Sequence, residues 1–304
     1  MAIVSVENLK MSYDKGRVKA LKGVTFDVEE GEIFGLIGPD GAGKTSLFRI
    51  LTTLLLADSG KAVVDGMDVV NDYKKIRRHI GYMPGRFSLY QDLTVEENLS
   101  FFATVFNTTI EENYHLVEDI YRQIEPFKKR KAGKLSGGMK QKLALSCALI
   151  HAPHVLFLDE PTTGVDPVSR KEFWEMLQKL KKNFKLSIVV STPYMDEALQ
   201  CDRIALIQDG QFLTIDTPEN IIRAYTQTLW SLRSDKMHKL LTDLRGIDGV
   251  KTAFAFGENH HATIDTSVLT VDSLRNRLVS LGHRNIVIEV VEPTIEDCFM
   301  NLQK

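Results

Sequence analysis

Residues 33–46 read IFGLIGPDGAGKTS, an apolar run that passes directly into a glycine-rich loop. The apolar run predicts a buried strand over 33–37, and the segment from Ser46 to Leu54 predicts a helix. A loop between such elements lets backbone N–H groups surround phosphate oxygens at a helix N-terminus. The residues predicted to contact a nucleotide are Gly38, Pro39, Asp40, Gly41, Ala42, Gly43, Lys44, Thr45 and Ser46. An ordinary glycine-rich turn is the alternative, which the complete motif disfavours.

Lys44 is expected to reach the β- and γ-phosphates, and the Thr45 hydroxyl to coordinate Mg2+. A second apolar strand over 155–158 ends in Asp159 and Glu160, which places two carboxylates at the edge of a parallel sheet where ligands bind. Asp159 is then a predicted Mg2+ ligand, and Glu160 the predicted base that polarises the attacking water. The alternative is an acidic pair that merely starts a turn.

A third motif, LSGGM at residues 135–139, leads into an apolar helical stretch over 143–150. In order with the other two, it resembles the signature of the ATP-binding subunits of ATP-binding cassette (ABC) transporters. By this resemblance, Ser136, Gly137 and Gly138 contact ATP held by a second cassette, although Ser136 alone would read as a helix cap. Tyr13 resembles the aromatic residue that stacks on adenine; the alternative is a half-buried strand tyrosine.

The resemblance covers most of residues 1–220 and implies an α/β fold with a P-loop nucleotide-binding core. It also implies an N-terminal antiparallel β portion, with a hairpin turn at Asp65-Gly66 between 63–64 and 69–70, and a helical subdomain over about 86–150. Beyond it, residues 221–304 predict a small α+β accessory domain of order strand-helix-strand-strand-helix-strand. There, Ser234 is expected to cap a helix over 235–244, and 294–297 to form a capping box.

Two positions depart from the family pattern. Gly85 stands where the family has a Gln that reaches Mg2+ and the attacking water. Pro193 stands where the family has a His that contacts the γ-phosphate, and proline offers neither a side-chain donor nor a backbone N–H. Because one preorganised contact is worth on the order of a hundredfold in rate, we expect ATP binding to survive better than hydrolysis.

These departures bear on the partner. Cassettes of this family pair head to tail, so a homodimer would carry two sites that both lack the Gln and the His. We favour a heterodimer, in which the intact signature completes the site of a second, different cassette; a homodimer remains the alternative. Local replacement by Arg86, Tyr194 or water is a third interpretation.

The composition agrees with a subunit whose membrane domain is supplied by other chains. The formal net charge is -2 and charged residues are 26%, so nucleic acid is not an expected partner. No apolar run approaches the ~20 residues that span a bilayer, which implies separate transmembrane permease subunits and a cytoplasmic location on the inner membrane face. Three scattered cysteines predict buried thiols, and the pairs His260-His261 and His151 with His154 are not expected to bind metal.

The sequence thus predicts an ATPase that uses ATP and Mg2+ in a transporter. The tail over 292–299, EPTIEDCF, resembles drug-resistance and polysaccharide-type exporters, which favours export. Two alternatives are an ATP-gated regulatory subunit with little hydrolysis and a soluble cassette ATPase of DNA repair or translation. The second disagrees with the lack of a long coiled coil, a second cassette or a basic stripe.

Overall fold

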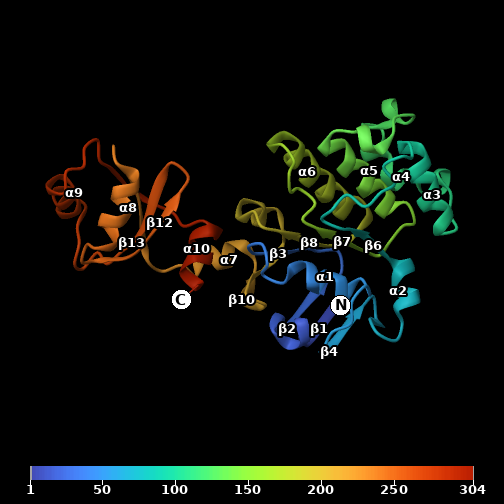
Figure 1. Ribbon diagram of the computed structural model, residues 1–304, viewed down its shortest axis with the longest axis horizontal. Coiled ribbons are helices and arrows are strands. Elements are labelled where there is room, and N and C mark those ends of the chain that lie inside the picture. The colour runs from blue at the N-terminus through green and yellow to red at the C-terminus, as the bar shows by residue number, and fades with distance from the viewer. Residues whose placement is uncertain (1, 304) are drawn as a thin grey trace. The chain divides into compact units, whose positions relative to one another are not determined.

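The computed structural model describes residues 2–303, and the chain divides into two compact units, Met1–Pro218 and Glu219–Lys304. Figure 1 colours the first unit from blue to yellow and the second in orange and red. Among the described residues, no helix has both the length and the apolar character needed to cross a lipid bilayer.

The first unit is built on a six-stranded sheet. From edge to edge its strands are β10 (Gln211–Asp216), β9 (Arg203–Gln208), β3 (Ile33–Ile37), β8 (Ser187–Thr192), β7 (Val155–Asp159) and β6 (Ile80–Met83). All neighbours are parallel except β10, which runs antiparallel to β9. Every residue of β3, β7 and β8 is buried, as continuous apolar strands of a sheet covered on both faces should be.

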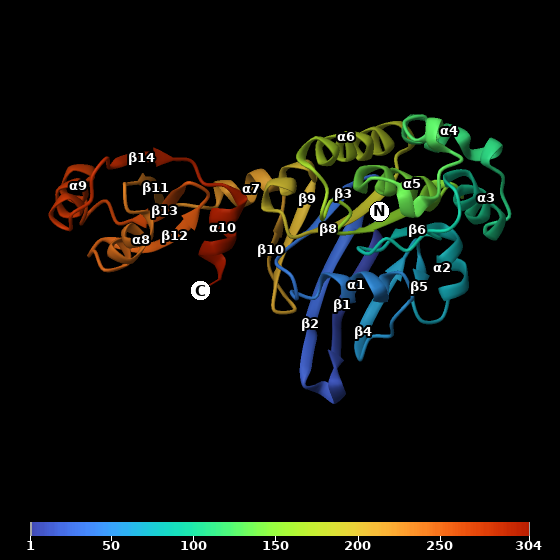
Figure 2. The same ribbon diagram turned by 45° about the horizontal axis from the view of Figure 1, so that its top comes forward.

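Different elements cover the two faces of this sheet. The helices α1 (Lys44–Leu51) and α6 (Pro167–Phe184) lie on opposite faces (Figure 2). On the α1 face, Phe48 of α1 packs edge-on against Phe157 of β7 with ring centroids 5.8 Å apart. This packing fixes the helix N-terminus at the carboxyl end of β3, so the loop that precedes α1 has a rigid frame.

A four-stranded antiparallel sheet shares the core on the α1 side. Its strands are, in order, β2 (Val18–Glu29), β1 (Ala2–Tyr13), β4 (Ser59–Val64) and β5 (Met67–Asp68). The predicted hairpin turn is present, since Asp65 and Gly66 have φ of 51° and 71°, the left-handed values that a tight two-residue hairpin requires. The strand expected at 69–70 was placed wrongly, because this turn pairs Val64 with Met67 and Val63 with Asp68.

The segment predicted as the helical subdomain carries three longer helices. They are α3 (Val95–Val105), α4 (Ile110–Tyr121) and α5 (Gly137–Leu149). Thr94 and Thr109 begin α3 and α4 with capping boxes, each hydroxyl accepting from the N–H of a Glu three residues on. The remaining short helices of this unit are η1 (Asp14–Gly16), α2 (Tyr73–His79), η2 (Glu125–Phe127), η3 (Ala132–Lys134) and η4 (Met195–Gln200).

The second unit starts within α7 (Pro218–Arg223), and after this helix its elements have the predicted order. Its antiparallel sheet runs β12 (Val250–Phe256), β13 (Asn259–Ile264), β11 (Thr228–Arg233) and β14 (Val287–Val291). Its helices are α8 (Met237–Arg245), α9 (Val271–Ser280) and α10 (Ile295–Leu302). Leu240 of α8 and Leu274 of α9 share one core with Trp230 of β11. Thr294 caps α10 through the predicted capping box. The α/β core and the additional antiparallel sheet confirm the predicted fold class.

Two helix starts differ from the sequence prediction. The helix after the phosphate loop begins at Lys44 rather than Ser46 and ends at Leu51, because Thr53 is left-handed with φ of 63°. Ser234 does not cap α8, which starts at Met237 with Lys236 in the cap position and no side-chain cap. The Ser234 hydroxyl instead accepts from the Lys236 N–H and pairs with His283.

Candidate nucleotide-binding site

The phosphate loop between β3 and α1 takes a path that only glycine permits. A Cβ on Gly38 would lie 2.1 Å from the Ile207 carbonyl oxygen, and one on Gly43 would lie 2.4 Å from that of Ala20. Gly43 also has φ of 107°, in the left-handed region. Of the other predicted loop residues, Ala42 is buried, whereas Pro39, Asp40 and Gly41 are exposed. The loop is therefore held open as a cradle at the N-terminus of α1.

Lys44 points into this cradle. Its Nζ donates to the carbonyl oxygens of Gly38 and Pro39 at 2.7 and 3.0 Å and lies 3.2 Å from Glu160 Oε1. The Lys44 side chain is only 3% exposed, while that of Glu160 is 22% exposed. A buried ammonium needs compensation, which the carbonyls and the carboxylate supply here and an anionic phosphate would supply in the same place.

Two hard oxygen donors meet beside Lys44. Thr45 Oγ1 donates to Asp159 Oδ1 at 3.2 Å, and Asp159 is 2% exposed at the end of β7. A hydroxyl and a carboxylate at this separation are the donor types that Mg2+ prefers, with the remaining positions left to water and phosphate oxygens. The residues present therefore fit a Mg2+ ion.

Ser191 was missed by sequence reasoning. It lies opposite Asp159 in the β7–β8 register, and its hydroxyl donates to Asp159 Oδ1 at 2.7 Å while accepting from the Glu160 N–H at 3.0 Å. Glu160 itself has φ of 50°, an uncommon value for a non-glycine residue. Ser191 thus orients both acids. The available signal was its position at the end of a third buried strand, but no motif marks it.

A cavity of about 450 Å3 opens in front of these groups. Tyr13 is 37% exposed on its wall, and the Tyr13 hydroxyl is 3.0 Å from Ser46 Oγ. The predicted residues lining it are Tyr13, Gly41, Gly43, Lys44, Thr45, Ser46 and Glu160. Lys19, Lys22 and Asp209 also line it and were not predicted. Its size is that of an ordinary small-molecule site.

The two altered positions lie at this edge of the sheet without adding a polar side chain. A Cβ on Gly85 would be 3.0 Å from the Asp159 carbonyl oxygen and 3.8 Å from Glu160 Cβ, so Gly85 passes close to both acids. Pro193 follows directly after β8. Tyr194 lies with its ring 4.2 Å from the Arg170 guanidinium, and among the described residues neither Tyr194 nor Arg86 lines the cavity.

A buried carboxylate holds the Pro193 loop in place. Glu197 is 3% exposed and accepts hydrogen bonds from Thr192 Oγ1 at 2.6 Å and Thr162 Oγ1 at 3.0 Å. Its other oxygen accepts from Arg170 Nε at 3.0 Å. This cluster, which sequence reasoning missed, joins the segment after β7, the end of β8 and the first turn of α6.

The signature residues lie elsewhere in the chain. Ser136 is exposed and caps α5 by accepting from the Met139 N–H at 3.4 Å, and Gly137 is exposed beside it. A Cβ on Gly138 would be 2.9 Å from Ser169 Oγ of α6, which explains the glycine. None of the three lines the described cavity around Lys44. The structure therefore does not bring the signature and the phosphate loop together within one chain.

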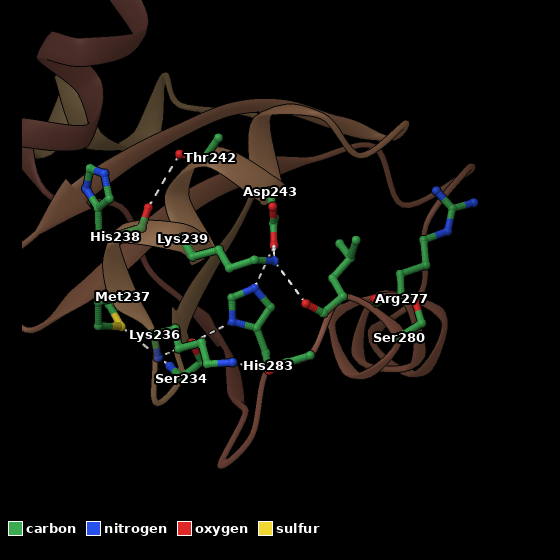
Figure 3. Close-up of polar contacts among 12 residues, drawn as sticks. Ser234, Lys236, Met237, His238, Lys239, Thr242, Asp243, Arg277, Ser280 and His283 are labelled. Atoms are coloured by element: carbon green, nitrogen blue, oxygen red, sulfur yellow. Dashed lines mark hydrogen bonds and ion pairs between the residues drawn. The ribbon is translucent and has the colours of Figure 1, made fainter.

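In the second unit, Ser234, His283 and Asp243 form a hydrogen-bonded arrangement with a structural role. His283 Nε2 lies 2.8 Å from Asp243 Oδ2, and His283 Nδ1 lies 3.1 Å from Ser234 Oγ (Figure 3). The His283 side chain is 0% exposed, so its imidazole is enclosed. Lys239 Nζ bonds Asp243 at 2.6 Å and also the Leu281 carbonyl. Lys239 first, and then His283, lowers the pKa of Asp243. The arrangement fastens α8 to the end of α9.

The histidines and cysteines discussed in the sequence analysis lie in different local environments. His261 pairs with Asp297 at 2.7 Å, while His260 Nε2 contacts the Met237 carbonyl oxygen at 2.7 Å. His151 stacks on Phe106, and burial lowers its pKa. The three cysteines, Cys147, Cys201 and Cys298, are free and buried, and burial raises the pKa of each thiol, as expected of inert core residues.

Comparisons with known proteins identify the family of the chain. Residues 21–163 match the family model described as ABC transporter. The chain is 42% identical over 221 residues to the probable multidrug ABC transporter ATP-binding protein YbhF of Escherichia coli (strain K12), which covers 71% of this chain and 38% of YbhF. It is 30% identical over 314 residues to the linearmycin resistance ATP-binding protein LnrL of Bacillus subtilis (strain 168), which covers 99% and 98% of the two chains.

A solved structure has the same fold. It is the dimeric structure of a post-hydrolysis state of the ATP-binding cassette MJ0796 bound to ADP and Pi, with a TM-score of 0.64, 27% identity, and coverage of 70% of this chain and 98% of that chain. The chain belongs to the ATP-binding proteins of ABC transporters, and the predicted resemblance to this family is confirmed. It spans 38% of the length of YbhF, a longer relative.

Proposed function

We propose that this chain binds MgATP in the cavity around Lys44 and is the ATP-binding subunit of a membrane exporter. The observation that carries the proposal is the convergence of Lys44 and Thr45, from the first turn of α1, with Asp159 and Glu160, from the end of β7, within hydrogen-bond distance. A phosphate in the cradle would replace the Glu160 carboxylate at Lys44 and release Glu160 toward the attacking water. Tyr13 would stack on the adenine ring.

The roles of the residues follow from their contacts. Thr45 Oγ1 and Asp159 would hold Mg2+, which neutralises charge on the phosphates when bound. Lys44 would bind the phosphate oxygens, and the helix N-terminus of α1 would add N–H donors. Glu160 would accept a proton from the attacking water, with Ser191 orienting its backbone.

We propose that hydrolysis at this site is slow, because Gly85 and Pro193 themselves offer no side-chain donor to the γ-phosphate or to the attacking water. The function would then be completed in a heterodimer, in which the exposed Ser136 to Gly138 segment contacts ATP held by a different cassette. The dimeric MJ0796 cassette supports pairing as such. The alternative role, an ATP-gated regulatory subunit, is favoured by the same two positions and differs in having no productive partner site.

We propose separate transmembrane subunits and a position on the cytoplasmic membrane face. An apolar cavity of about 320 Å3 beside the Gly85 loop supports this. Met83, Leu89, Phe102 and Phe106 are among its lining residues, and it would accept a helix of a transmembrane subunit. In the same loop, Tyr90 packs edge-on against Phe101 with ring centroids 4.9 Å apart. Export is proposed from the names of the relatives, a multidrug and a linearmycin resistance protein.

The test is ATP turnover and direct ATP binding by the purified chain, beside Glu160→Gln and Lys44→Ala. We expect ATP binding in the wild type and in Glu160→Gln, with turnover near background in both. Robust turnover that Glu160→Gln abolishes would overturn the slow-site proposal and favour a self-sufficient homodimer. Absence of ATP binding in the wild type would overturn the function itself.

A further inference from the structure

A cluster of two histidines and one aspartate lies in the first unit, outside the nucleotide cavity. Asp65 Oδ2 is 2.6 Å from His79 Nδ1 and 2.9 Å from His154 Nδ1. One donor atom from each of the three residues lies within 4.8 Å of the others. The two imidazole rings meet edge to face with centroids 4.9 Å apart. Both rings therefore present the same nitrogen to one carboxylate oxygen.

The backbone holds these three residues in place without help from their side chains. Asp65 lies in the left-handed turn between β4 and β5, and its N–H donates to the Ile3 carbonyl at 2.7 Å. His79 ends α2, and the His154 N–H donates to the His79 carbonyl oxygen at 2.8 Å. Because the backbones are already fixed, binding of a ligand to the three side chains would cost the protein little additional conformational entropy.

We propose that Asp65, His79 and His154 form a binding site for a divalent transition-metal ion of the Zn2+ class. Two imidazole nitrogens and one carboxylate oxygen are a donor set that suits Zn2+, whereas Mg2+ and Ca2+ prefer oxygen donors alone. The exposed fractions are 41% for the His79 side chain, 59% for His154 and 18% for Asp65. Solvent therefore reaches the cluster and supplies water for the remaining coordination positions.

The geometry needs a small adjustment. Tetrahedral bonds of about 2.0–2.1 Å place ligand atoms about 3.3 Å apart, so each imidazole must move back from Asp65 by about half an ångström. Side-chain rotation of the half-exposed rings achieves this without moving the backbone. The competing structure is a hydrogen-bonded staple, in which both Nδ1–H groups donate to the carboxylate and no cation is bound.

The experiment is Zn2+ binding by the untagged full chain, measured by isothermal titration calorimetry in the presence of excess Mg2+. We expect about one Zn2+ per chain, and an affinity at least about tenfold lower in Asp65→Asn and in His154→Ala. Asn tolerates the left-handed turn and still accepts hydrogen bonds, so Asp65→Asn retains the staple and removes only the anionic ligand. His238→Ala is the control, because His238 is an exposed histidine of the second unit.

Visible absorption of the Co2+-loaded chain is a second readout, because it reports ligand geometry around the ion itself. Tetrahedral Co2+ bands that disappear in His154→Ala would support the site. Zn2+ uptake that is absent from the wild type, or equal in wild type, Asp65→Asn and His154→Ala, would overturn the proposal. Circular dichroism of each variant separates loss of the site from loss of the fold.

Discussion

On one side of the candidate nucleotide site, Thr45 and Ser191 both donate to Asp159, at 3.2 and 2.7 Å. On the same side, Lys44 donates to the Gly38 carbonyl oxygen at 2.7 Å. On the other side, Gly85 and Pro193 bring backbone to the same edge of the sheet and no polar side chain. Under the proposed function, the first side has the groups that would bind a nucleotide, and the second lacks groups that would act on the transferring phosphate. Binding and hydrolysis should therefore depend on different residues and be separable by mutation.

The second side has nevertheless kept its supporting structure. Glu197 still joins the Thr192 end of β8 to Arg170 of α6 and to Thr162. Gly85 still passes within contact distance of Asp159. The backbone of both loops is thus held in position, although Gly85 and Pro193 offer no polar side chain. The comparison can therefore be tested by removing groups from the first side and by adding groups to the second.

The largest effect is expected from Lys44→Ala on the binding side. It removes a buried ammonium that would form two charge-assisted bonds, so ATP affinity should fall about a hundredfold. Equilibrium dialysis or a fluorescent nucleotide measures it. Lys179→Ala, an exposed lysine of α6, is the control, and an equal loss in both variants would contradict the assigned role.

Restoring the second side is expected to raise turnover about tenfold in Gly85→Gln/Pro193→His. One preorganised donor is worth on the order of a hundredfold, but the Gln Cβ meets the Asp159 carbonyl at 3.0 Å, so the loop must shift and only part of the gain returns. Steady-state phosphate release measures the gain. Adding Glu160→Gln should abolish it, and a gain that persists would come from another base.

Ser191→Ala is expected to lower the affinity of the ATP-bound chain for Mg2+ about tenfold, as the loss of a residue that orients a metal ligand usually does. The substitution removes the donor to Asp159 Oδ1 and the acceptor for the Glu160 N–H. ATP affinity measured across a Mg2+ titration checks this. Ser100→Ala changes an exposed serine of α3 and should leave the Mg2+ dependence unchanged.

The smallest effect is expected far from the nucleotide, in Asp243→Asn. Loss of the charged partner of Lys239 and His283 should lower the stability of α8 by about 1 kcal/mol, measured by amide hydrogen exchange. Because the folded pKa of Asp243 is depressed, its contribution is present above the unfolded pKa of about 4 and is lost as the pH falls through the folded pKa. The variant should lack this pH dependence, the exposed Asp248→Asn should retain it, and ATP affinity should not change.

The sequence predicted those parts of the site that short motifs encode. The phosphate loop, Asp159 and Glu160 were identifiable because strand, loop and helix follow one another within a few residues. Ser191, Glu197 and the cluster of Asp65, His79 and His154 were not, because most of their partners lie far apart in the chain and meet only in the folded structure. The Ser234 cap failed for a related reason, since tertiary pairing with His283 takes that hydroxyl.

The exposed position of Ser136, apart from the cavity around Lys44, has a genetic consequence under the proposed pairing. Each composite site would draw its phosphate loop from one subunit and its signature from the other. If the chain paired with itself, a Ser136 variant and a Lys44 variant expressed together would form mixed pairs with one fully intact site, so two defective alleles would complement each other. In the proposed heterodimer they would not, because each pair holds only one copy of this chain and the two variants never meet. A cross between two loss-of-function strains would thus reveal the stoichiometry of the assembly without purifying it.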